Sequence, residues 1–236
     1  MALPKLNATP SYEVRVPSSG EILKFRPFLV KEQKILLIAS ESKDRRQIIR
    51  AMLDTIQNCI EEDIDVTKLT TFDVDYMFMQ MRAKSVGEKV KLNLPCSDCE
   101  AVSDAEINLE DVTMNVEETE RTVPITDQIS VKLSYPTYFR FIKDNILENA
   151  ESQSEILMEI IISCIDAIIT EDEMINARDE SREELMKFVE SMTAGQFEDI
   201  SQFVQNIPVL SHTLEFDCVG CGKHNEFKLE GLEDFF

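Results

Sequence analysis

Short runs in which apolar and polar residues alternate predict β-hairpins along the chain. Residues 12–25 alternate on both sides of a Pro-Ser-Ser-Gly turn, and Pro27 stops the pattern. Residues 129–135 alternate in the same way until Pro136 stops them. An apolar-rich segment follows each proline, so the same local plan occurs twice.

Between these strands, apolar residues three or four positions apart predict amphipathic helices. One such stretch covers residues 48–60, and another covers 157–168. A further helix is predicted to begin at Thr70. Ser181 and Thr193 each stand three residues before a glutamate or glutamine, which is the capping-box spacing at a helix start. The helix that opens after Ser181 has no counterpart in the first half of the chain.

Two Cys-x-x-Cys knuckles occur at residues 96–99 and 218–221. Each follows an alternating, strand-like segment and leads into another. Apolar segments that end in acidic residues follow both knuckles, at 107–111 and at 229–234. The flanks therefore match as well as the cysteines do, and this indicates an internal duplication.

The predicted fold is α+β, with a repeat of hairpin, helices and strand-knuckle-strand. We expect the first repeat in residues 1–112 and the second, with its additional helix, in 113–236. The acidic stretch 117–120 is the expected junction. The knuckle regions, about 88–112 and 212–234, are expected to pair into one zinc-ribbon-like element.

Four cysteines in two such turns are the ligand set of one structural zinc site. We expect Cys96, Cys99, Cys218 and Cys221 to hold one Zn²⁺ per chain, with no open position for a substrate water. Gly222 suits the left-handed conformation that a knuckle often needs, so the second knuckle is the better formed. The ion would hold the two ends of an intervening helical block together.

Two other interpretations of these cysteines remain open. A thioredoxin-type redox pair would place one Cys-x-x-Cys at the start of a helix, whereas both pairs here lie between predicted strands. Alternatively, His212 and His224 flank the second knuckle and could complete a separate two-cysteine, two-histidine site.

The two remaining cysteines, Cys59 and Cys164, are predicted to be small buried apolar residues. The Met- and Phe-rich stretch 76–81 fits either a core helix or a partner groove, and the core is favoured.

Composition narrows the function further. The chain has 236 residues and a formal net charge of −21, which disfavours binding to a phosphate backbone. Its amino terminus lacks a signal peptide and no stretch approaches about 20 apolar residues, so we expect a cytosolic protein without a membrane segment. Only two histidines occur, and no phosphate-cradling or HExxH motif is present. We therefore expect no catalytic residues and no enzyme.

Four long segments resemble one known family. They span residues 25–34, 72–88, 126–136 and 229–236, and the similarity extends over nearly the whole chain. They resemble the baseplate hub family of T-even-like myoviruses, which includes hub subunits and hub assembly proteins.

The resemblance implies a virus-encoded, non-enzymatic protein that helps to build the central hub of the tail baseplate. Its partners would be other hub or tape-measure proteins, and it would act in the host cytoplasm during assembly or stay in the virion tail baseplate. The rival hypothesis is a zinc-ribbon regulator that binds nucleic acid or polymerase. That class predicts a basic surface at the knuckles, where this chain places Asp98, Glu100 and Asp217.

Overall fold

The structure is a computed structural model, and it describes residues 10–114, 116, 121–143 and 152–235. The chain forms two compact units. Unit 1 comprises Met1–Val66, Phe72–Asn115 and Val209–Phe236, and unit 2 comprises Thr67–Thr71 and Val116–Pro208. Unit 1 is therefore discontinuous in sequence, with most of unit 2 inserted between its second and third segments.

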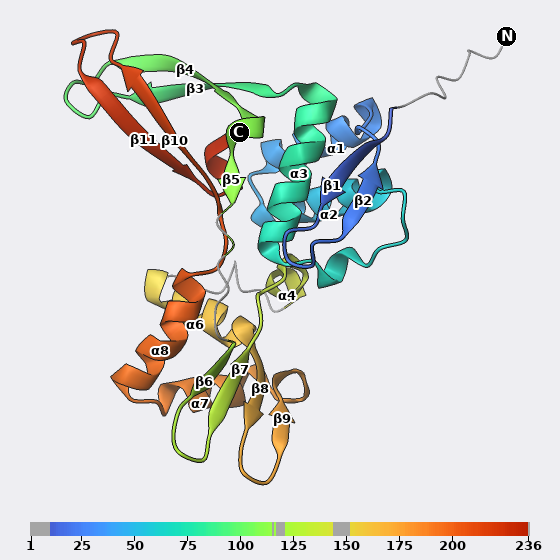
Figure 1. Cartoon of the computed structure of the whole chain (residues 1–236), viewed down its shortest axis with the longest axis vertical. Helices are drawn as coiled ribbons and strands as arrows, with labels where there is room; N and C mark the ends of the chain where they lie inside the picture. Colours follow the sequence, from blue (N-terminus) through green and yellow to red (C-terminus); the bar gives the residue numbers. More distant parts are fainter. Residues whose placement is uncertain (1–9, 115, 117–120, 144–151, 236) are drawn as a thin grey trace, which may run out of the picture. The chain divides into compact units, whose positions relative to one another are not determined.

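Unit 1 combines helices with short antiparallel sheets (Figure 1). Its strands are β1 (Tyr12–Arg15), β2 (Ile22–Phe25), β3 (Lys89–Pro95), β4 (Val102–Asn108), β5 (Thr113–Met114), β10 (Leu210–Asp217) and β11 (His224–Glu230). Its helices are α1 (Val30–Ser42), α2 (Arg45–Cys59) and α3 (Thr71–Val86), with 3₁₀ turns η2 (Leu109–Asp111) and η4 (Leu232–Phe235). A further turn, η1 (Val66–Lys68), precedes α3.

The first hairpin forms where the alternation predicts it. Val14 and Leu23 are paired across β1 and β2 and are buried, while the intervening side chains face outward. Gly20 makes the turn with a φ of 73°, and its N–H donates to the carbonyl of Val16. The buried carboxylate of Asp73 in α3 accepts hydrogen bonds from the N–H and hydroxyl of Ser18. These two bonds fix the hairpin on the helix.

Helix α3 is a central helix of unit 1. Phe72, Met77, Met79 and Met81 are each at most 1 % exposed. Unbranched methionines fill irregular gaps in a core, and this helix uses them on several faces. The Met- and Phe-rich stretch is thus buried in the protein's own core, as favoured from the sequence, and is no exposed groove.

Unit 2 is a four-stranded antiparallel sheet with helices. Its strands are β6 (Thr122–Pro124), β7 (Ser130–Leu133), β8 (Ile165–Ile169) and β9 (Met174–Asn176), hydrogen-bonded in that order. Its helices are α4 (Tyr138–Lys143), α6 (Gln153–Cys164), α7 (Arg182–Glu190) and α8 (Ala194–Gln205), with a 3₁₀ turn η3 (Ala177–Asp179). Ser181 and Thr193 are the N-caps of α7 and α8, as the capping-box spacing predicts.

The predicted helix over 157–168 is partly wrong. Helix α6 ends at Cys164, and Ile165 begins strand β8, which pairs with both β7 and β9. Periodicity could not show this because a run of buried isoleucines fits either structure. The guanidinium of Arg140 donates to the carbonyls of Ile162, Ser163 and Ile165 and so satisfies the end of the helix.

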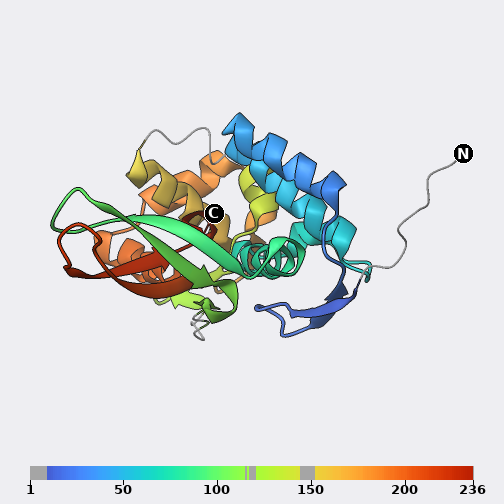
Figure 2. The same ribbon diagram turned by 90° about the horizontal axis from the view of Figure 1, so that it is seen from above.

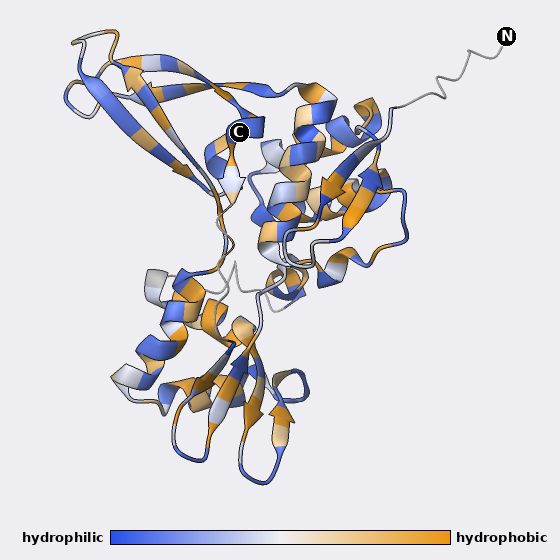
Figure 3. Ribbon diagram, in the orientation of Figure 1, coloured by the Kyte–Doolittle hydropathy of each residue, from blue (hydrophilic) through white to orange (hydrophobic). Residues whose placement is uncertain are grey.

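Apolar side chains of the sheet and helices form the core of unit 2. Val131 and Leu133 from β7 pack with Ile161 and Ile165, and α8 adds Ile200. In Figure 3, β7 and β8 carry much of the apolar colouring of this unit. The core of unit 2 therefore joins residues of the sheet with residues of α6, α7 and α8.

The two unpaired cysteines lie in the cores, as predicted. Cys59 and Cys164 are at most 1 % exposed. Burial raises the pKa of Cys59 to about 11 and that of Cys164 to about 12. Both are therefore neutral thiols at physiological pH and are poor nucleophiles.

The α+β class is confirmed. Both halves of the chain contain a hairpin, helices and a strand-knuckle-strand element, but the second half also places the β8–β9 hairpin between its helices. A duplication with boundaries at 1–112 and 113–236 stays a prediction. The expected junction at 117–120 lies outside the described residues. Within the described ranges no helix combines the length and apolar character needed to cross a membrane.

Candidate metal centre

Two β-hairpins of unit 1 hold the knuckles at their tips. Strands β3 and β4 pair from Lys89 with Asn108 to Pro95 with Val102, so the turn between them contains the first knuckle. Strands β10 and β11 pair from Ser211 with Glu230 to Asp217 with His224, and their turn contains the second. The hairpins lie side by side with their tips at the same end in both views (Figures 1 and 2).

The four sulfurs form one cluster. Cys96, Cys99, Cys218 and Cys221 each direct one Sγ to within 4.8 Å of all the others. The Sγ atoms of Cys96 and Cys221 are 3.8 Å apart, and Cys99 Sγ lies 3.6 Å from both Cys218 and Cys221. Zinc–sulfur bonds of about 2.3 Å in a tetrahedron place the sulfurs about 3.8 Å apart. The cluster therefore has the size of one four-thiolate metal site.

Backbone N–H groups within each knuckle stabilise thiolate at its first cysteine. The N–H groups of Asp98 and Cys99 lower the pKa of Cys96 to about 6. The N–H groups of Cys221 and Gly220 likewise lower the pKa of Cys218. In each knuckle, two backbone N–H groups thus stabilise the thiolate of the first cysteine, which is the form that binds a metal.

The second cysteine of each knuckle behaves differently. The N–H of Ala101 lowers the pKa of Cys99, but the thiols of Cys218 and Cys221 outweigh it and raise the pKa to about 12. The N–H of Lys223 and the thiol of Cys99 lower the pKa of Cys221, but burial and the thiols of Cys218 and Cys96 outweigh them and raise it. Four thiolates this close repel one another. A divalent cation among them would remove that repulsion, and the donor set suits a soft, tetrahedral ion.

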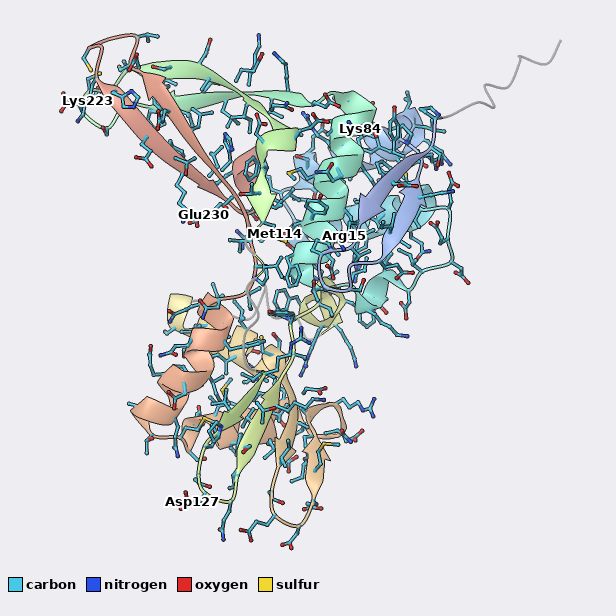
Figure 4. The ribbon with its side chains drawn as sticks, in the orientation of Figure 1. Arg15, Lys84, Met114, Asp127, Lys223 and Glu230 are labelled. Carbon is cyan, nitrogen blue, oxygen red and sulfur yellow. The ribbon has the colours of Figure 1, made fainter. Side chains whose placement is uncertain are left out.

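Polar contacts in three residue pairs join the two knuckle turns without any metal. Oδ1 of buried Asn225 accepts hydrogen bonds from the N–H of Ser97 at 2.9 Å and from its hydroxyl at 2.8 Å. The hydroxyl of buried Ser103 accepts from the N–H of Val219 at 3.2 Å. Lys223, labelled near the hairpin tip in Figure 4, pairs with Asp98 at 3.3 Å.

Glycines allow the close approach of the knuckles. A Cβ added to Gly220 would lie 2.8 Å from the Cβ of Ala101 in the other knuckle. Gly222 has a φ of 71°, the left-handed conformation predicted for the second knuckle. Glu100, its counterpart, has no positive φ, so the first knuckle turns without this conformation.

The histidines do not join the cluster. Nδ1 of His224 lies 2.9 Å from Oδ1 of Asp217, and this contact raises the pKa of the imidazole. Nδ1 of His212 lies 3.3 Å from the carbonyl oxygen of Asp111. Among the described residues, the group that could hold a metal ion contains the four cysteines without either histidine. This geometry disfavours a separate two-cysteine, two-histidine site.

The sequence identified the sulfurs but missed the side chains that position them. Asn225 occupies an inward position of β11. The next two inward positions of this strand, Phe227 and Leu229, are apolar. A polar residue at an inward strand position was the available signal. Ser97 and Ser103 carried no such signal because serine is ordinary in a turn or near a strand end.

A comparison with protein families bears on the whole chain. Residues 9–236 match the model described as T4 bacteriophage base plate protein. The chain belongs to this baseplate family. No match was found among curated proteins or among solved structures.

Family membership implies that the partners of the chain are other baseplate proteins. The T4 base plate family is a structural one. The family match thus agrees with the resemblance to baseplate proteins that the sequence showed. The cluster of four cysteines therefore lies in a protein of a structural family. A site made of four sulfurs suits a structural ion.

Proposed function

We propose that the protein acts in assembly of the central hub of the viral tail baseplate, as a hub subunit or as an assembly chaperone for hub or tape-measure proteins. The match to the base plate family over residues 9–236 is the observation that carries this proposal. The protein works through protein–protein contacts and performs no catalysis. It acts in the host cytoplasm during assembly.

Within this function, Cys96, Cys99, Cys218 and Cys221 bind one structural Zn²⁺ per chain. The sulfur spacing and the N–H donors to Cys96 and Cys218 support that role. The ion would fix the tips of the β3–β4 and β10–β11 hairpins together within unit 1. It would thereby make a rigid, acidic projection available to a partner.

The metal is tested on protein purified under reducing conditions. We expect one zinc per chain, and loss of that zinc in Cys96→Ser and in Cys221→Ser. Val219→Ser is the matched control because Val219 lies in the same knuckle and is 76 % exposed. Wild-type protein without zinc would reject the metal site.

The assembly role is tested in infected cells. Affinity-tagged protein should capture hub or tape-measure components, and quantitative mass spectrometry of purified virions should separate the two forms of the role. A subunit is retained at a fixed copy number, whereas a chaperone is abundant in the lysate and absent from the particle. Capture of no baseplate component would reject the proposal. Tight DNA or RNA binding in a low-salt gel shift would favour the rival regulator.

A further inference from the structure

Helix α1 exposes an apolar face that unit 1 leaves uncovered. Val30 is 79 % exposed, Leu37 is 57 % exposed and Ile38 is 55 % exposed. Glu32 and Ala39, on the opposite side of the helix, are buried. Figure 2 shows α1 running alongside α2 at the outer edge of unit 1.

The exposed residues form one helical stripe. Val30, Lys34, Leu37, Ile38 and Glu41 follow the spacing i, i+4, i+7, i+8 and i+11, which places them on one face. This is the spacing of a face that packs against another helix. Its centre is apolar, with a lysine before it and a glutamate after it.

The charges of this stripe oppose the dipole of their own helix. A helix favours anions near its amino end and cations near its carboxyl end, but Lys34 lies toward the amino end of α1 and Glu41 lies in its last turn. Within the part of the chain that the structure describes, neither side chain forms an ion pair. Stability of the isolated helix therefore does not explain their placement.

We infer that this face pairs with α1 of a second copy of the chain, antiparallel, about a two-fold axis that passes between Leu37 and Ile38. In that register Leu37 meets Ile38 of the second copy. Lys34 meets Glu41 of the second copy, and the symmetry repeats each contact. The stripe is thus self-complementary in both charge and apolar contact, which is what a two-fold interface needs.

The local charge also permits this contact. Two chains with a net charge of −21 repel one another over most of their surface. Residues 30–50 carry six basic and three acidic side chains, so α1 and α2 form a basic region in an acidic protein. A 13-residue helix is about 20 Å long, so one helix pair makes a small interface and a concentration-dependent dimer.

The test is sedimentation equilibrium of the full chain, with zinc and reductant, from about 1 to 200 µM, a range suited to a small interface. We expect a monomer–dimer equilibrium. Lys34→Glu and Glu41→Lys should each weaken it by roughly tenfold or more, because each places two like-charge pairs in the dimer. Lys187→Glu is the matched control, since it makes the same charge change at an exposed position of helix α7.

Charge exchange makes the test specific for this register. The double variant Lys34→Glu with Glu41→Lys should dimerise like wild type. An equimolar mixture of the two single variants should form a heterodimer, because every pair across the axis is then attractive. A protein that is monomeric throughout the range would overturn the inference. So would a dimer insensitive to both single changes, or a mixture that does not associate.

Discussion

Asn225 in β11 accepts two hydrogen bonds from Ser97 in the opposite knuckle, and its own amide donates to the carbonyl of Lys223 at 2.8 Å. One buried side chain therefore ties the first knuckle to the second and orders the turn that follows Cys221. These bonds involve no sulfur, so they position the ligands whether or not an ion is bound.

Replacing this side chain should weaken metal binding without removing a ligand. We expect Asn225→Ala to lower zinc affinity about 10- to 100-fold while keeping one site per chain, as loss of an outer-shell partner usually does. Competition with a chromophoric chelator measures the change. Asn93→Ala, at an exposed position of β3, is the control and should bind like wild type. Equal affinities for both variants would contradict the role of Asn225.

The approach of the knuckles predicts a size-exchange effect. Gly220→Ala would place a Cβ 2.8 Å from that of Ala101 and push the tips apart, so zinc affinity should fall. Adding Ala101→Gly removes the opposing methyl group and should restore affinity. Gly222→Ala is the comparison: its added Cβ meets nothing within 4 Å, so its cost is the left-handed conformation alone, about 1 kcal/mol. Failure of the double variant to recover would exclude steric separation as the cause.

Glu32 should make the stability of unit 1 depend on pH. Burial alone would raise the pKa of this carboxyl, but hydrogen bonds from Arg26 and Leu29 outweigh it and lower the pKa below its usual value. A lowered pKa in the folded state means that the stabilisation is present above the unfolded pKa, about 4.3. It is lost as pH falls through the folded value.

We therefore expect Glu32→Gln to lower the free energy of unfolding by about 1–3 kcal/mol near neutral pH. The difference from wild type should shrink as the pH falls below about 4. Urea unfolding across this range measures it. Glu13→Gln, on the exposed side of β1, should stay within about 0.5 kcal/mol of wild type. A deficit that does not change with pH would show that the carboxylate charge is irrelevant.

Arg140 should control the junction between α6 and β8. Its guanidinium donates to three carbonyls there, the shortest bond being 2.8 Å to Ser163. Arg140→Met leaves these buried acceptors without that donor and should destabilise unit 2 by about 1–3 kcal/mol. Amide hydrogen exchange should increase at residues 160–169 more than elsewhere. Lys143→Met, an exposed change on the same helix, should leave exchange there unaltered.

Features fixed by local chemistry could be predicted from the sequence. The β1–β2 hairpin, the caps at Ser181 and Thr193, and the two Cys-x-x-Cys turns all follow from residue types at short spacing. The end of α6 could not be predicted in this way. It depends on Arg140, which is 23 residues from Ser163 in sequence, and on two strands that pair with β8.

The same distinction applies within the metal centre. The cysteine spacing predicts two turns. The contact of Asn225 with Ser97, however, spans 128 residues and forms only once both hairpins are present. The close approach of Ala101 and Gly220 is equally non-local. Sequence patterns therefore located the four sulfurs, and tertiary structure supplied the contacts that align them.

The discontinuity of unit 1 sets an order of events during synthesis. Cys218 follows Cys99 by 119 residues, and ribosomes add about 5–20 residues per second, so the first knuckle waits roughly 6–24 s for its partner strands. Residues Val116–Pro208, which make up most of unit 2, are made within that interval, and its short segment Thr67–Thr71 is made before it. Unit 2 can therefore fold while unit 1 is still incomplete. Closing the sulfur cluster would then be a late step that follows the folding of unit 2.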